Sequence, residues 1–398
     1  MEDWKEYKLG DIATSVKDRI DTSILDKNSY ISTENMLPNK SGVTSSSGIP
    51  AGNAIRFQEG DVLVSNIRPY FKKIWRAGFE GGCSMDVINL RATNRVEPLF
   101  LYYLLSQDSF FDYVMQGAKG TKMPRGDKKQ IMQWSLCLPS INGQKHIAAL
   151  LKSLDDKIEC NRRINDNLEQ QAQALFKSWF VDFEPFKDKP FVESELGMIP
   201  QGWKVVELGD LVEIIDNRGK TPPLVSKDLY PIIDVKALTG LGRVLDYNKC
   251  SKYVNHETYT SWFRSGHPKK YDILLSTVGS LAETKLFMGG NGCIAQNVVA
   301  LRNIDYSLYL YDYLNRIKSD LVAYNIGSVQ PSIKITHIVK HKIIVPQAKV
   351  LERYQILSRK LTESICNYCS EIDNLSSLRD ELLPKLMSGE INVNEVKL

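Results

Sequence analysis

The chain contains 398 residues, of which 43% are hydrophobic and 25% are charged, and its formal net charge is +4. This length predicts two or more domains, the near-neutral charge excludes a uniformly basic or acidic protein, and no apolar run approaches the roughly 18 residues that a membrane span needs. The seven cysteines are scattered and odd in number, so we expect a cytoplasmic protein with no membrane partner and no disulfide framework.

The first predicted element is a globular segment over residues 1–139. Its short β-rich runs include "GDVLVSNIR" (60–68) and "CSMDVINLR" (83–91). Another stretch, "KGTKMPRGDKK" (119–129), groups five Lys and Arg residues against a single acid, Asp127. Such a basic loop suits phosphate contacts, because each neutralised phosphate releases counterions.

The next predicted element is a helix over residues 140–183. Its seam positions recur at alternating spacings of four and three residues from Ile147 to Trp179, a pattern typical of a coiled coil. Asn161 and Asn165 occupy seam positions. A buried Asn at such a position tends to fix the register of paired helices at a cost in stability.

Residues 184–202 are rich in Pro, Gly and charge, which predicts a linker, and residues 203–346 then repeat the motifs of the first globular segment in order. The matching pairs are WKEYKLGD (4–11) with WKVVELGD (203–210), GDVLVSNIR (60–68) with YDILLSTVG (271–279), CSMDVINLR (83–91) with IAQNVVALR (294–302), LFLYYLL (99–105) with LYLYDYL (308–314), GTKMP (120–124) with GSVQP (327–331), and CLPS (137–140) with IVPQ (344–347). The offset between partners drifts from 199 to 211 and back to 207, which indicates loop insertions and deletions within a shared fold.

The last predicted element is a second helix over residues 347–391, which carries the seam of the first helix shifted by 207 residues. Leu383-Pro384 is expected to close it. Because the registers match, we expect the two helices to pair; the alternative is that each packs on its own domain. The seam residues expected to hold the helices together are Leu151, Leu154, Ile158, Leu168, Leu361, Ile365, Ile372 and Leu375.

Motifs that would indicate an enzyme or a metal site are weak in this sequence. "RGKTPP" (218–223) lacks the earlier glycine of a phosphate-binding loop, since Ile214 occupies that position. "CNYC" (366–369) is a lone CxxC within helical heptads, and "HIVKH" (337–341) lacks the glutamate of a zinc-protease motif. We therefore predict a non-catalytic chain with no metal and no cofactor of its own.

Basic loops in both halves favour double-stranded DNA as the partner. Residues 321–351 contain no Asp or Glu, and "WFRSGHPKKY" (262–271) interleaves basic and aromatic residues. Lys and Arg on such loops contact phosphates, and neighbouring polar side chains reach base edges. The residues expected at DNA are Arg19, Lys122, Arg125, Lys128 and Lys129 in the first half, and Arg218, Lys220, Ser328, Gln330, Lys334 and His337 in the second.

The chain resembles the specificity subunit of type I restriction–modification systems over nearly its whole length. The resemblance rests on the two-fold repeat and on the order of "SELGMIPQGWKVVELGD", "RGKTPP", "NIGSVQPSI" and "LRDELLPKLMSGEI". The first half of the chain departs from the family pattern at two places: "GTKMPRG" stands where the second half has "GSVQPSI", and "VKDRIDTS" stands in place of the "RGKTPP" turn. The second departure aligns Arg19 with Arg218.

The resemblance implies a mixed α/β fold with two target recognition domains in tandem, separated by two long helices that pair as an antiparallel coiled coil. The domains would recognise a bipartite, asymmetric DNA site. The helices would dock two modification subunits, methyltransferases that bring S-adenosylmethionine to the N6 of adenine. Trp179 and Phe180 on outward faces of the helices are candidates for that contact, but Trp179 also falls on the seam, so core packing is an equal alternative for it. Restriction subunits would add ATP-dependent translocation and cleavage.

Two other functions are consistent with parts of the sequence. A free-standing coiled-coil DNA-binding regulator would bind DNA tightly without a methyltransferase, but two unlike modules argue against palindromic half-sites. A nucleotide-dependent enzyme rests on "GKT" (219–221) alone. Loss of ATP binding on replacement of Lys220 would support that second alternative.

Overall fold

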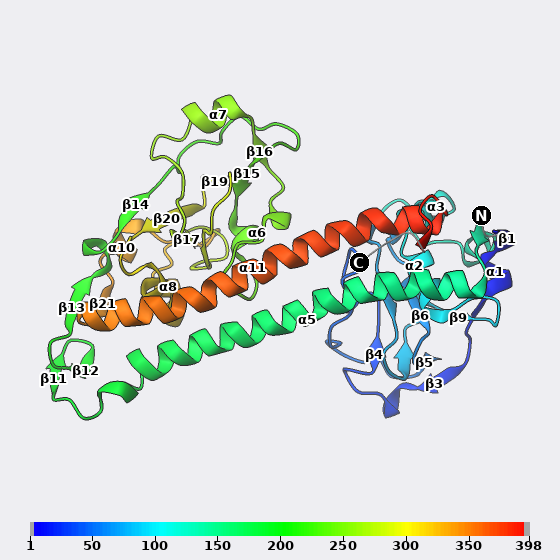
Figure 1. Ribbon diagram of the computed structural model, residues 1–398, viewed down its shortest axis with the longest axis horizontal. Coiled ribbons are helices and arrows are strands. Elements are labelled where there is room, and N and C mark those ends of the chain that lie inside the picture. The colour runs from blue at the N-terminus through cyan, green and yellow to red at the C-terminus, as the bar shows by residue number, and fades with distance from the viewer. Residues whose placement is uncertain (1–3, 394–398) are drawn as a thin grey trace. The chain divides into compact units, whose positions relative to one another are not determined.

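The computed structural model describes residues 4–393 and forms two compact units. Unit 1 comprises Met1–Ile158 and Asn374–Leu398, and unit 2 comprises Glu159–Asp373. Figure 1 shows two long helices, α5 (Ile141–Phe180) and α11 (Ala348–Met387), and each contributes to both units.

Unit 1 is built on two four-stranded sheets. The antiparallel sheet has the order β2 (Ala13–Ser15), β9 (Val87–Ala92), β6 (Val62–Ser65) and β7 (Ile74–Arg76). The second sheet has the order β3 (Arg19–Asp21), β5 (Asn53–Phe57), β8 (Gly81–Cys83) and β4 (Tyr30–Ile31), and its β4–β8 pair is parallel. The helices of the globular part are α1 (Leu9–Ile12), α2 (Pro98–Leu105), α3 (Asp108–Gln116) and α4 (Lys128–Ile131).

Strand β6 shows why this sequence forms a buried strand. Val62 and Val64 face a core that includes the side chains of α2 and α3, whereas Leu63 faces a second core that includes Phe57. Successive side chains of a strand point to opposite faces of its sheet. A continuous apolar run therefore supplies both cores of unit 1.

Unit 2 repeats much of this plan. Its antiparallel sheet has the order β14 (Glu213–Ile215), β20 (Val298–Arg302), β17 (Ile273–Ser276) and β18 (Thr284–Leu286). Its three-stranded sheet has the order β16 (Tyr253–Val254), β15 (Tyr230–Ile233) and β19 (Cys293–Ile294), and β15–β19 is parallel like β4–β8. The other elements are α6 (Val235–Leu238), α7 (His256–Ser261), α8 (Ser307–Arg316), α9 (Lys318–Val322), α10 (Ile335–Val339), and a hairpin of β11 (Phe191–Ser194) and β12 (Gly197–Pro200).

Each globular segment is closed by a two-stranded antiparallel sheet made from its two ends. Strand β1 (Lys5–Lys8) pairs with β10 (Ser135–Leu138), and β13 (Lys204–Glu207) pairs with β21 (Lys342–Val345). These strands bring the beginning and the end of each segment together just before the long helix starts. The mixed α/β fold predicted from the sequence is confirmed.

Helices α5 and α11 pack in antiparallel fashion within each unit. In unit 1, Arg379 Nη1 donates a hydrogen bond to Asp155 Oδ1 at 2.8 Å. In unit 2, Asn165 Nδ2 lies 3.4 Å from Cys369 Sγ, and the ring centroid of Phe180 lies 4.8 Å from that of Tyr354. Residue numbers thus rise along α5 as they fall along α11.

The predicted seam residues are buried or half-buried, and none of them is exposed. Leu151, Leu154, Ile158 and Ile365 are buried. Asn161 is fully buried, and neither its amide nitrogen nor its oxygen has a hydrogen-bond partner among residues 4–393. An unsatisfied buried amide is destabilising, so packing of the neighbouring apolar positions must offset its cost.

Two details of the helices differ from the sequence predictions. Phe180 is only 5% exposed and belongs to the core of unit 2, so it does not lie on an outward face. Trp179 is half-buried and packs against the same core, as the alternative for this seam residue expected. Pro384 does not close α11, because the helix continues to Met387. Proline is compatible with helical φ and forfeits one backbone bond near the helix end, and burial of Leu386 and Met387 stabilises the last turn.

Candidate nucleic-acid interface

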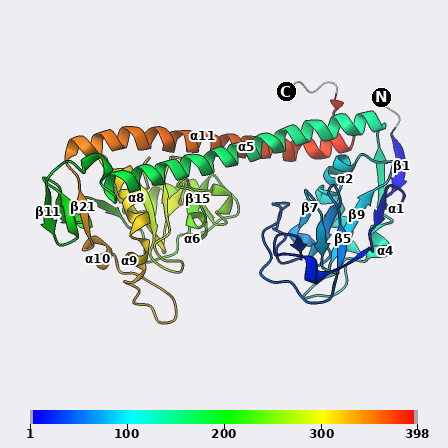
Figure 2. The same cartoon turned by 90° about the horizontal axis from the view of Figure 1, so that it is seen from below.

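The first candidate surface is a loop over residues 325–332, between α9 and α10, which we call tip loop 2. Figure 2 shows the chain between these helices projecting on the side of unit 2 away from α11. Asn325 Oδ1 accepts hydrogen bonds from the backbone N–H groups of Gly327 and Ser332 at 3.0 and 2.9 Å. A Cβ at position 327 would lie 1.9 Å from the Gln330 carbonyl oxygen, so glycine is required there. The exposed side chains of tip loop 2 include those of Ser328, Val329 and Gln330.

Unit 1 contains an equivalent loop over residues 119–125, which we call tip loop 1. The Gly279 N–H donates to the Pro331 carbonyl at 2.9 Å, and in unit 1 the Arg68 N–H donates to the Pro124 carbonyl at 2.8 Å. The match between GTKMP and GSVQP therefore extends from sequence to backbone bonds. The exposed side chains of tip loop 1 include those of Thr121, Lys122 and Met123.

The predicted basic residues around tip loop 1 differ in how they are paired. The Arg125 guanidinium lies 3.3 Å from a carboxylate oxygen of Asp86, and Lys128 Nζ donates to the Met85 carbonyl at 3.3 Å. Lys122 and Lys129 are exposed, and no ion pair of either is found among residues 4–393. These two lysines are the charges most available to a phosphate.

Arg19 belongs to a different sheet of unit 1 from the strand that leads to the contact with tip loop 1. It begins β3 in the second sheet, opposite Ile55 of β5, whereas Arg68 beside tip loop 1 follows β6 of the first sheet. Arg218, its aligned partner, lies in a turn after β14. Arg19 follows β2 and Arg218 follows β14, which hold equivalent places in their sheets. Arg19 itself lies in a strand, whereas Arg218 lies in a turn.

The turn over residues 216–220 lines a cavity of about 430 Å³ together with Ser261, Trp262 and Arg264. Arg218 donates to both carboxylate oxygens of Asp216, at 2.8 and 2.9 Å, so its charge is largely compensated. Burial raises the pKa of Asp216, but the hydrogen bonds and charge of Arg218 outweigh burial and hold that pKa below its usual value.

Lys220 and Arg264 are the exposed cations of this cavity. Arg264 and Trp262 were not among the residues predicted at DNA, although the basic and aromatic stretch 262–271 contains both. The sequence contains no signal that joins the two segments, because only the fold brings residues 261–264 beside the 216–220 turn.

The 216–220 turn and tip loop 2 are joined beneath the surface through the buried Thr277. Arg218 Nη1 donates to Thr277 Oγ1 at 3.4 Å, and the Thr277 carbonyl accepts from the Ile333 N–H at 2.9 Å. Val278 forms a β-bridge with Ser332. The fold therefore brings Arg218, Lys220, Ser328 and Gln330 to neighbouring loops.

Lys334 and His337 lie at the start of α10, next to tip loop 2. Lys334 is the exposed N-cap residue of α10, and His337 is half-buried with its ring centroid 5.9 Å from that of Tyr324. The neighbouring His341 has a structural role, because its Nδ1 is hydrogen-bonded to the Tyr324 hydroxyl at 2.9 Å and burial lowers its pKa.

Replacing Lys334 by alanine is expected to weaken binding to all DNA duplexes by a similar factor, because a phosphate contact positions the protein without selecting a sequence. The plot of log affinity against log salt concentration should become shallower by about 0.9 for the lost phosphate contact. Titration of specific and random duplexes at several salt concentrations measures both effects. A loss confined to one base pair of the site would show that Lys334 contacts a base.

Unit 2 also contains a buried charge cluster, which is structural. Arg243 is fully buried; its Nε donates to Glu169 at 2.9 Å, its Nη2 to Asp312 at 3.2 Å and its Nη1 to Thr362 Oγ1 at 3.0 Å. Burial lowers the pKa of Arg243, but the two carboxylates raise that pKa by more than burial lowers it, so the net shift is upward. Burial raises the pKa of Asp312 to about 6, against the opposing charge of Arg243. The cluster joins α5 and α11 to the globular part of unit 2.

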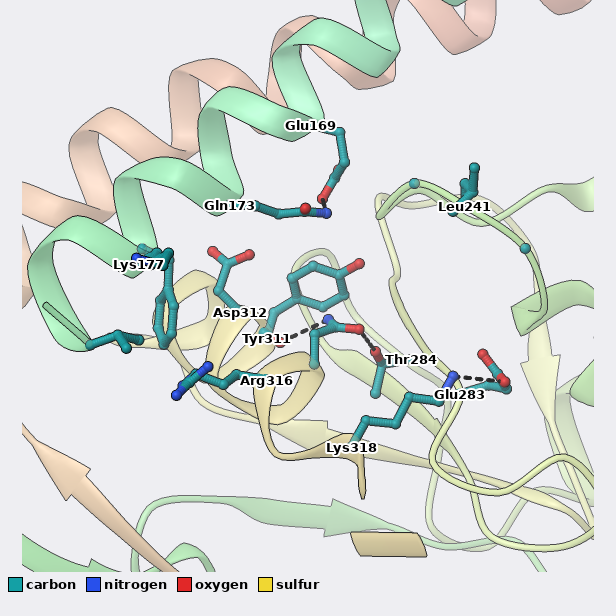
Figure 3. A pocket seen from close by; sticks show the side chains of 15 residues that line it. Glu169, Gln173, Lys177, Leu241, Glu283, Thr284, Tyr311, Asp312, Arg316 and Lys318 are labelled. Atoms are coloured by element: carbon teal, nitrogen blue, oxygen red, sulfur yellow. Dashed lines mark hydrogen bonds and ion pairs between the residues drawn. The ribbon is translucent and has the colours of Figure 1, made fainter. Parts of the chain in front are cut away.

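A cavity of about 410 Å³ lies beside this cluster, between α5 and α8. Figure 3 shows Glu169, Tyr311 and Asp312 lining it, with Lys318 bonded to Glu283 on the opposite side. Its acidic groups have partners within the chain, so the cavity resembles a gap in packing more than a ligand site. Within residues 4–393, no cluster of His, Cys, Asp and Glu has the composition of a metal site, and no helix is long and apolar enough to cross a membrane.

Comparison with known proteins found matches over most of the chain. Residues 1–170 and 200–365 match the model of the type I restriction modification DNA specificity domain. The chain is 30% identical to the MjaIX specificity subunit of Methanocaldococcus jannaschii, over 77% of this chain and 72% of the relative. It is 26% identical to the HindI specificity subunit of Haemophilus influenzae, over 98% of this chain and 100% of the relative. The fold is similar to that of the S subunit from M. genitalium, with a TM-score of 0.60 and 15% identity over 97% of this chain and 96% of the other.

Proposed function

The chain belongs to the family of type I restriction–modification DNA specificity subunits, the non-catalytic part of those enzymes, and from this premise we propose that its two halves recognise two unlike half-sites of one bipartite DNA sequence. The target recognition domains in this proposal are residues 1–139 and 203–346. Residues 140–183 and 347–391 are the spacer helices, and residues 184–202 link the two halves.

One observation carries the proposal: two equivalently braced loops present different side chains. The tip of tip loop 1 carries Lys122 where tip loop 2 carries Val329, and both are exposed. A cation and an aliphatic side chain favour different base edges. Two modules of the same fold with unlike tips are therefore suited to an asymmetric site.

The remaining residues of the proposed DNA surface supply charge and polar contacts. Cationic side chains contact the phosphates, above all those without an ion pair in the fold, and polar tips approach the bases. The proposed set is Arg19, Lys122, Arg125, Lys128 and Lys129 in unit 1, and Arg218, Lys220, Ser328, Gln330, Lys334 and His337 in unit 2. Arg264 is added because it shares the cavity of Lys220.

The proposed partners bring the chemistry that this chain lacks. Two modification subunits would bind exposed faces of α5 and α11 and supply S-adenosylmethionine for methylation of the adenine N6. Restriction subunits would supply ATP-dependent translocation and cleavage. All seven cysteines of the chain are free, which fits assembly in the reducing cytoplasm.

Exchange of one globular segment is expected to change one half of the methylated motif. Residues 1–139 are replaced by the matching segment of a relative with a different motif, and the chain is co-expressed with its modification subunit. Pull-down and sequencing of N6-methyladenine should reveal a gapped, two-part motif in which only one half changes. The closing sheets β1–β10 and β13–β21 lie within the exchanged segments, so each segment carries its own closure.

Exchange of residues 203–346 is the matched control, and it should change the other half of the motif. If no modification subunit copurifies and no motif appears, the assembly proposal fails. A free-standing DNA-binding regulator would then be the better account.

A further inference from the structure

We infer that Val329 recognises a thymine in the half-site of unit 2 by packing against its 5-methyl group in the major groove. This inference rests on the proposed function, because it names the chemistry by which one recognition loop selects a base. It concerns one residue that the sequence analysis did not place at DNA.

The first argument is the exposure of Val329 on a loop that is held in place. Its side chain is 98% exposed, although it is aliphatic and lies between the exposed Ser328 and Gln330. The two hydrogen bonds to Asn325 Oδ1 fix the loop on either side of the tip. A braced loop loses little conformational freedom on binding, so the exposed side chain is already positioned for a partner.

The second argument is the charge around the tip. Residues 321–351 contain no Asp or Glu, and exposed Lys334 lies just after the loop. No carboxylate of this segment would repel a phosphate backbone, and Lys334 can contact one. The surroundings of Val329 thus favour a polyanion over an apolar protein surface.

The third argument is the chemistry of the major groove. Its base edges present hydrogen-bond donors and acceptors, and its apolar group is the thymine C5-methyl. Valine can neither donate nor accept a hydrogen bond through its side chain, so the methyl group is the feature that it can recognise. Ser328 and Gln330 beside it can satisfy neighbouring polar base edges.

Tip loop 1 provides an internal comparison. Its Lys122 occupies the position of Val329 on an equivalently braced loop, and its ammonium group would favour the acceptors of guanine. The thymine contact is therefore assigned to the half-site of unit 2 alone.

The test uses the chain assembled with its modification subunits and duplexes that carry its methylated motif. Each thymine of the half-site assigned to unit 2 is replaced in turn by deoxyuridine, which removes the 5-methyl group and leaves the pairing edge intact. Binding is measured by fluorescence anisotropy for the natural chain and for Val329→Ala. One replacement should weaken binding by the natural chain about fourfold, the factor for one buried methyl group. Val329→Ala should bind the thymine duplex about as weakly and lose nothing further with deoxyuridine.

Lys334→Ala serves as the matched control, because it should weaken binding generally and retain the sensitivity to deoxyuridine. The inference is overturned if no replacement weakens binding by the natural chain, if Val329→Ala remains sensitive, or if the half-site contains no thymine. Sequence-specific binding persists in each of these outcomes. Absence of any specific binding would instead overturn the proposed function.

Discussion

Replacing Arg243 by methionine is expected to lower the free energy of unfolding by about 3–5 kcal/mol, the usual effect of removing one partner from a buried ion pair. The guanidinium is fully buried and bonds Glu169, Asp312 and Thr362. Its removal leaves two carboxylates in a poorly solvated site without their cation. Urea unfolding followed by circular dichroism measures the loss.

The destabilisation of Arg243→Met is expected to depend on pH. Burial already raises the pKa of Asp312 to about 6 from an ordinary 3.8, and loss of the guanidinium raises the pKa further. A carboxyl group whose pKa is higher in the folded chain binds more protons there than in the unfolded chain. Its stabilising contribution is present at low pH and lost as pH rises through the folded-state pKa. The natural chain and the variant lose this contribution alike up to about pH 6, so the deficit of the variant should grow as pH rises above about 6.

Arg264→Met is the matched control for this prediction, because Arg264 is an exposed arginine of the same unit. A surface substitution usually changes stability by less than about 0.5 kcal/mol. Combining Arg243→Met with Glu169→Gln and Asp312→Asn should recover much of the loss, since no unpaired charge then remains buried. A loss below about 1 kcal/mol in Arg243→Met would contradict the structural role of the cluster.

Replacing Phe180 by alanine is expected to lower the free energy of unfolding by about 3–5 kcal/mol, as for other buried aromatic residues. Its ring centroid lies 4.8 Å from those of Tyr309 and Tyr354 and 5.9 Å from that of Trp203. The substitution leaves a cavity where the end of α5 meets the core of unit 2. Denaturant titration measures the change.

Phe180→Leu is the control, and its cost should stay below about 1.5 kcal/mol because most of the buried volume is kept. A residue on an outward docking face would give the opposite pattern. Unchanged stability of Phe180→Ala together with loss of a copurifying modification subunit would place Phe180 at the partner surface instead of in the core.

The helices were the most predictable part of this fold. A seam maintained over many turns is a long, repeated signal, and the structure places α5 and α11 207 residues apart, the offset seen between the seam positions. Asn161 was predicted as a buried seam residue, and it is fully buried. Long periodic patterns average out local exceptions, which is why they survive in the folded structure.

Contacts between distant segments were not predictable from the sequence. Arg243 lies in a Gly-rich turn with no periodicity, yet it bonds Glu169 of α5 and Thr362 of α11. The compensation of Arg218 by Asp216 and the cavity shared with Trp262 likewise depend on how the loops fold back. Phe180 was predicted on an outward face, but it lies in the core of unit 2. The helical pattern predicts which residues face the partner helix, and it does not show which other residues a globular core buries.

The division of the chain into units has a consequence for biosynthesis. Unit 2 is one continuous stretch, Glu159–Asp373, whereas unit 1 needs Asn374–Leu398 in addition to its first 158 residues. The globular part of unit 1 leaves the ribosome first, but its core lacks Leu383, Leu386 and Met387 until translation has passed unit 2. The segment made earliest is thus the one whose packing is completed last. The apolar surface that these residues cover stays exposed throughout the synthesis of unit 2, and exposed apolar surface of this kind is what makes incompletely folded chains prone to aggregation.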